Sequence, residues 1–138
     1  MAVETDDLLQ DFVAESLDRL AEVEEQLLSL ESQPGDGDGA VVNSVFRTMH
    51  SVKGAAGLLG LSTASRLAHE LEDVLNLMRH GELGATGEVV DALLFGSDAL
   101  RRLMANVEQS NEANVTEPLR RLAQVLESHV LPETAARL

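Results

Sequence analysis

One histidine in the sequence stands among residues that suit nucleophilic chemistry. In the segment MHSVKGAAG, His50 is followed by Lys53 after three residues, by Gly54 after four and by Gly57 after seven. On a helix these spacings place the four residues on or near one side. His50 also comes one residue after an apolar position, so it lies about 100° from the core side of that helix. We therefore expect an imidazole at the edge of the core, partly open to solvent.

Gly54 and Gly57 are unexpected inside a helix. Each glycine costs about 1 kcal/mol relative to alanine, and the same segment uses Ala55 and Ala56 freely. We interpret the glycines as leaving room for a partner protein. A surface without side chains beyond His50 lets another protein's active site close over the imidazole. A second interpretation is that they only allow two helices to pack closely.

A second polar group lies in the segment RLAHELEDVLNLMR. His69 and Glu72 fall on one side of this helix, away from its apolar stripe. A carboxylate from a neighbouring helix could accept the N–H of the His50 ring. That bond fixes the tautomer and leaves the other ring nitrogen as a nucleophile. For Glu70 and Asp73 we favour a solvated acidic surface.

These segments do not complete other catalytic or metal-binding motifs. Lys53 precedes Gly54, whereas the lysine of a Walker A loop follows a glycine and precedes Ser or Thr. His69-Glu70-Leu71-Glu72 is followed by Asp73, where a zincin motif requires a second histidine. The sequence therefore predicts no cofactor site and no metal site, and a metal-binding bundle is only a distant alternative.

The elements that must position these residues are helices. The chain has 138 residues and no Trp, Tyr or Cys, and its apolar residues are mainly Leu, Ala and Val, which disfavours a sheet. Helical periodicity recurs in five segments, at about 5–30, 40–60, 62–80, 88–109 and 116–131. Short connections between the first four predict an all-α fold, an antiparallel up-down four-helix bundle with a fifth C-terminal helix.

Local signals set the expected boundaries of these elements. Thr5 is the predicted N-cap of the first helix, and Ser62 or Thr63 of the third. Gly81 suits the C′ position after the third helix, and Gly96 is a weak point within the fourth. We assign residues 1–131 to the helical-bundle domain and residues 132–138 to the start of a linker.

The charge of the chain restricts its partners. The formal net charge is −14, and such a surface repels phosphate backbones and anionic lipid. We therefore expect no nucleic-acid or membrane partner. The acidic excess favours a monomeric domain, or a partner that carries a positive patch. No secretory signal is visible, and no apolar run approaches the roughly 18 residues of a membrane span. A cytoplasmic location is the expectation that follows.

The residues from His50 to Gly60 fit H-S-x-K-G-x-x-x-x-x-G. This pattern resembles the phosphorylation motif of histidine phosphotransfer (HPt) domains, most closely the N-terminal domain of the chemotaxis histidine kinase CheA. FVAESLDRLAEVEEQLLSLE resembles the first helix of that family, and RLAHELEDVLNLMRHGEL resembles its third helix, including His69-x-x-Glu72. The detailed likeness covers about residues 8–83.

The resemblance implies a role for each matching residue. His50 is then the phosphoryl acceptor and donor, Lys53 lies near the phosphate, and Glu72 holds the His50 ring. His69 belongs to the same polar cluster, and the two glycines keep the surface open to partners. ATP and Mg²⁺ are expected on a separate kinase domain, and an Asp with its own Mg²⁺ on a response-regulator receiver domain. The domain is then a substrate and carrier, and not itself an ATPase.

Two alternatives stay open at this point. The chain could be a free-standing HPt protein of a multistep phosphorelay instead of a domain of a chemotaxis-type kinase. It could also be a non-catalytic helical docking or dimerisation module in which His50 is incidental. Phosphorylation by a kinase with ATP separates both phosphotransfer possibilities, the kinase domain and the free-standing protein, from the docking or dimerisation module.

Overall fold

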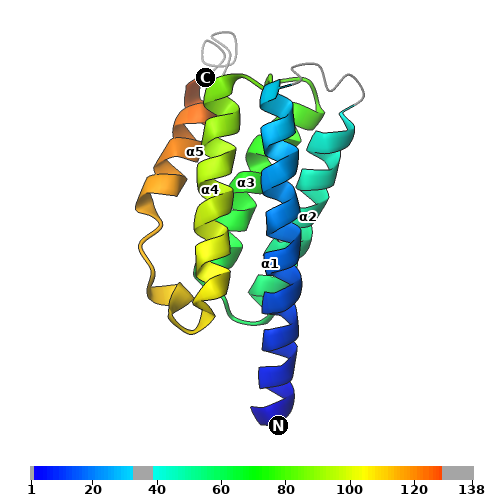
Figure 1. Ribbon diagram of the computed structural model, residues 1–138. Coiled ribbons are helices and arrows are strands. Elements are labelled where there is room, and N and C mark those ends of the chain that lie inside the picture. The colour runs from blue at the N-terminus through cyan, green and yellow to red at the C-terminus, as the bar shows by residue number, and fades with distance from the viewer. Residues whose placement is uncertain (1, 33–38, 129–138) are drawn as a thin grey trace.

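The computed structural model describes residues 2–32 and 39–128, and every regular element in these two ranges is a helix. In chain order the elements are α1 (Ala2–Ser32), α2 (Ala40–Leu58), α3 (Ser62–Arg79), α4 (Gly87–Ala105), the 3₁₀ helix η1 (Val107–Glu112) and α5 (Thr116–Ser128). Helices α1 to α4 form an antiparallel bundle, and α5 packs outside it against α4 and α3 (Figure 1). The predicted all-α bundle with a fifth helix is confirmed.

The core consists of the apolar stripes that the helical period predicts. In α2 the buried residues are the five expected ones: Val42, Val45, Met49, Val52 and Ala56. Leucines from the other helices fill the centre of the bundle, and Leu20, Leu67, Leu93 and Leu122 are each at most 1% exposed. His50 follows the buried Met49 by one residue, so it lies at the edge of this stripe and is directed partly outward. None of the described helices is long and apolar enough to span a membrane.

Two of the predicted N-caps are wrong. Helix α1 begins at Ala2, so Thr5 lies inside it. Nothing in the residues before Thr5 is a helix breaker, and the helix therefore continues to Ala2. At α3 the N-cap is the buried Leu61, and no side chain caps the helix.

The hydroxyls expected at the start of α3 serve a tertiary contact instead. The backbone N–H of Thr63 donates to Oδ1 of Asn111, and Thr63 Oγ1 donates to the Asn111 carbonyl at 3.1 Å. The Asn111 side chain also donates to the carbonyl of Gly60 at 2.9 Å. Asn111 belongs to η1, which replaces the last turn predicted for the fourth helix. Helix α4 ends at Ala105, and not near Gln109, because the tighter turns of η1 carry Asn111 to the α2–α3 connection.

Gly96 is a close-packing position and not a weak point. A Cβ atom there would lie 2.8 Å from Cδ2 of Leu71, so the glycine lets α4 approach α3. Gly81 has a φ of 71°, a left-handed conformation that suits the predicted C′ position. The predicted end of the fifth helix and the boundary between residues 131 and 132 lie outside the described residues, and the domain division stays a prediction.

Candidate functional site

The histidine of α2 meets a carboxylate of α3. Nδ1 of His50 lies 2.5 Å from Oε2 of Glu72, although the two residues are 22 positions apart in the chain. The His50 side chain is 66% exposed, whereas that of Glu72 is only 10% exposed. A buried group on one helix thus holds an exposed ring on its neighbour.

Lys53 completes this contact from one helical turn further along α2. Its ammonium donates to Oε1 of Glu72 at 2.7 Å, so each carboxylate oxygen has its own partner. Burial by itself raises the pKa of Glu72, but the hydrogen bonds and positive charges of Lys53 and His50 outweigh it and lower the pKa below 4.5. Glu72 is therefore ionised near neutral pH.

The ionised carboxylate determines which nitrogen of the His50 ring carries the proton. A carboxylate can only accept a hydrogen bond, so Nδ1 must be the protonated nitrogen that donates to Glu72. In the neutral ring Nε2 then keeps a lone pair. Because the side chain is largely exposed, an electrophilic group on another molecule can reach Nε2. The geometry suits nucleophilic group transfer.

One face of the His50 ring is covered by an aromatic side chain that our sequence reasoning missed. The rings of Phe46 and His50 are stacked, with centroids 6.2 Å apart and planes inclined by 15°. The guanidinium of Arg79, in the last turn of α3, lies 4.1 Å from the centre of the Phe46 ring. The four-residue spacing of Phe46 and His50 signalled a shared helix face, but nothing in the sequence indicated Arg79.

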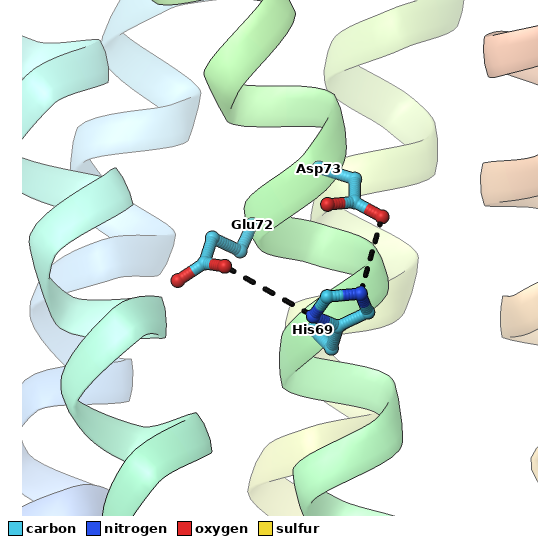
Figure 2. Close-up of side chains that lie close together, drawn as sticks. All are labelled: His69, Glu72 and Asp73. Carbon is cyan, nitrogen blue, oxygen red and sulfur yellow. Dashed lines mark ion pairs between the residues drawn. The ribbon is translucent and has the colours of Figure 1, made fainter.

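His69 lies beside Glu72 but makes a looser contact. Its Nδ1 is 4.0 Å from Oε1 of Glu72, and its Nε2 is 3.5 Å from Oδ2 of Asp73. Figure 2 shows the His69 ring between these two carboxylates, with Glu72 reaching towards α2.

The group formed by His69, Glu72 and Asp73 has the residue types of a metal site. Its two carboxylates, however, face opposite nitrogens of the ring, and one ion binds a histidine through a single nitrogen. Both oxygens of Glu72 also already accept hydrogen bonds, from His50 and Lys53. The arrangement is that of a polar cluster around Glu72 rather than of a ligand set.

The two glycines of α2 differ in their surroundings. A Cβ atom at Gly54 would meet nothing within 4 Å, so close packing of helices does not explain this glycine. At Gly57 a Cβ atom would lie 3.5 Å from Oγ of Ser65, an ordinary contact. That Ser65 hydroxyl donates to the carbonyl of Lys53 at 3.0 Å and links α3 to α2. The surface beside His50 is open at Gly54 and only lightly packed at Gly57.

Comparison with known proteins finds one family over most of the chain. Residues 7–110 match the profile of the Hpt domain family. The chain is 34% identical over 109 residues to a chemotaxis protein CheA of Halobacterium salinarum. The aligned region covers 79% of this chain but only 16% of that protein. The chain therefore spans about a sixth of the length of this relative.

Solved structures agree with this match. The phosphorylated P1 domain of CheA3 from R. sphaeroides, crystallised in complex with CheY6, has a TM-score of 0.73 and 29% identity, covering 90% of this chain and 96% of that one. The CheA phosphotransferase domain from Thermotoga maritima has a TM-score of 0.67 and 32% identity, covering 74% of this chain and 95% of that one.

Proposed function

The chain belongs to the Hpt domain family, and we propose on this basis that His50 accepts a phosphoryl group from a kinase and passes it to an aspartate of a response regulator. The observation that carries the proposal is the hydrogen bond between Nδ1 of His50 and Glu72, which leaves Nε2 as the free nucleophile. The proposed pathway is of the chemotaxis type, because the relatives are chemotaxis proteins.

The transfer itself needs positioning and charge neutralisation more than covalent help. As Nε2 attacks the terminal phosphorus of ATP, the new N–P bond forms while the O–P bond to the departing ADP breaks. The ring keeps its Nδ1 proton and gains positive charge, which the carboxylate of Glu72 stabilises at 2.5 Å. In the second transfer the N–P bond breaks as a carboxylate oxygen of the receiver bonds to phosphorus, and the ring returns to its neutral form.

Lys53 can neutralise part of the phosphate charge. An ammonium has three donor hydrogens, and one of them is used by Glu72. The other two are available to phosphate oxygens beside His50. His69 would support the polar cluster around Glu72 from α3. The open surface at Gly54 and Gly57 would admit the partner's active site.

The proposal assigns the remaining chemistry to partners. ATP and Mg²⁺ belong to a separate kinase domain, in the same or another chain, and a second Mg²⁺ belongs to the receiver domain. The complex of a similar P1 domain with CheY6 supports a receiver as partner. The proposal includes a monomeric domain in the cytoplasm, where ATP and the receiver are present.

The proposal also favours a domain of a larger kinase over a free-standing phosphotransfer protein. The curated relatives that match are several times longer than this chain. The sequence that follows Leu138 in the gene discriminates the two, since a kinase contains nucleotide-binding motifs there.

Labelling with radioactive ATP and a CheA-type kinase domain tests the proposal. We expect label that is stable in base and labile in acid, which is typical of phosphohistidine. The label should be lost in His50→Gln and retained in the matched control His80→Gln, an exposed histidine at the end of α3. Label that persists in His50→Gln would contradict the assignment of His50 as the phosphorylated residue. Absence of label in the wild type would favour a docking module.

A further inference from the structure

The charge of the chain is distributed unevenly over its helices. Helix α1 contains ten acidic residues and one arginine, a net charge of −9. Helix α2 contains no acidic residue and carries Arg47 and Lys53. Together α2 and α3 have a net charge of +1 in a chain whose total is −14. The helices that hold His50 and Glu72 are thus close to neutral, with a slight positive excess, in a strongly acidic protein.

The arginines of the described residues fall into two groups. Those of α1, α4 and α5 form ion pairs with carboxylates: Arg19 with Glu15, Arg101 and Arg102 with Asp98, and Arg120 and Arg121 with Glu117. In the described part of the chain, Arg47, Arg66 and Arg79 pair with no carboxylate, and all three are exposed. We call these three residues the cationic frame.

The cationic frame lies on the two helices that meet at the contact between His50 and Glu72. Arg47 lies one turn before His50 on the outer side of α2, and Arg79 covers the Phe46 ring that stacks on His50. Arg66 lines a groove of about 420 Å³ between α2 and α3, together with Lys53 and His69. One arginine of the frame therefore lies on α2, and the other two lie near the two ends of α3.

The carboxylates of α3 form no ion pair with the arginines of the frame. Glu72 is already shared by His50 and Lys53, and Asp73 faces His69. Glu70, on α3, makes no ion pair with any described residue. An incoming anion can pair with the frame without breaking an internal ion pair, so the usual cost of exchanging partners is absent.

We infer that the cationic frame guides a carboxylate-rich protein surface onto His50, namely the aspartate site of the phosphoryl-accepting receiver domain. This inference rests on the proposed function. A site that accepts a phosphoryl group on Asp and binds Mg²⁺ presents one or two further carboxylates beside the acceptor as ligands of the metal. Attraction to the frame and repulsion from α1 together orient such a partner before contact, and this kind of steering acts mainly on the association rate.

The test is the rate of phosphoryl transfer from the labelled domain to a receiver that accepts label from the wild type. The variant is Arg47→Gln/Arg66→Gln, which leaves Arg79 and its contact with Phe46 in place. We expect its second-order rate constant to fall about tenfold at 10 mM salt. The difference should vanish near 1 M salt, where the Debye length is about 3 Å. The rate at saturating receiver should be unchanged.

A matched control separates steering from a general change in charge. Arg101→Gln/Arg102→Gln removes the same two charges from α4, away from His50, and should leave the rate constant near that of the wild type. Equal losses in both double variants, or no loss in the first, overturn the inference while the proposed function stands. A loss confined to phosphorylation of His50 by the kinase domain also overturns it, since the frame would then act in binding the kinase domain and not the receiver. Absence of any transfer from His50 contradicts the proposed function itself.

Discussion

Oε2 of Glu72 lies 2.5 Å from Nδ1 of His50, and the carboxylate that makes this contact is almost fully buried. The burial matters because a carboxylate in water would be free to rotate and would hold the ring weakly. Lys53 supplies a second donor to the same carboxylate and fixes its orientation. The exposed nucleophile is therefore held by a contact that is itself part of the packed interface between α2 and α3.

We expect Glu72→Gln to lower stability in a pH-dependent way. The pKa of Glu72 is lowered in the folded protein, so its ionised form stabilises the fold above the ordinary value of 4.5. That stabilisation is lost as the pH falls through the lowered folded pKa. The free energy of unfolding should drop by about 1–3 kcal/mol at pH 7, and much less in strong acid. Urea denaturation at several pH values measures the difference.

The control for this experiment is Glu70→Gln, which removes the same charge from the same helix at a position without an ion pair. Its effect should be small at every pH. A Glu72→Gln effect of equal size at pH 7 and in strong acid would contradict the linkage to ionisation.

We expect Lys53→Arg to slow the phosphorylation of His50. The ammonium is a compact point charge, whereas the planar guanidinium needs more space and a different geometry. Removal of the charge in Lys53→Met should slow the reaction more, by about a hundredfold, as for a lost donor to a transition-state anion. Initial rates of labelling with a kinase domain measure both effects, and an unchanged rate in both variants removes Lys53 from the mechanism.

We expect Phe46→Leu to reduce the phosphorylation rate while the domain stays folded. Leucine can keep apolar contact with the core but cannot stack on the His50 ring. Aromatic pairs contribute about 0.5–1.5 kcal/mol beyond buried area, which corresponds to a rate loss of about two- to tenfold. The kcat of labelling should fall without a rise in KM for the domain. Phe46→Tyr should restore the rate, and a failure to do so would mean that the stack does not position the ring.

We expect Gly54→Ala to stabilise the protein and to slow transfer. The position is open, so alanine should raise the free energy of unfolding by about 1 kcal/mol through helix propensity. The new methyl group lies one turn beyond His50, on the surface that a receiver must approach. Thermal unfolding and transfer rates measure the two effects in the same sample. If stability rises and transfer is unchanged, clearance is not the reason for the glycine.

The periodicity of the sequence was sufficient to predict the bundle, because helix formation and the choice of a buried side depend on residues three and four apart. The buried residues of α2 follow from that period alone. The spacing of His50, Lys53 and Gly54 likewise placed these residues on one exposed side of a helix. The resemblance to HPt domains rested on the same local pattern.

Contacts between helices could not be read from the period, because they depend on how neighbouring helices are rotated and shifted relative to one another. Sequence reasoning placed His69 and Glu72 on one side of α3, but only the packing of α2 on α3 decided that Glu72 is buried against His50 and that His69 stays at its edge. The same packing brought Arg79 to Phe46, the ring that stacks on His50. At the end of α4, the contacts of Asn111 with the α2–α3 connection replaced the last predicted turn with a 3₁₀ helix. The sequence by itself thus determined which residues each helix exposes, whereas the tertiary structure decided which of them meet, because only packing sets the register between helices.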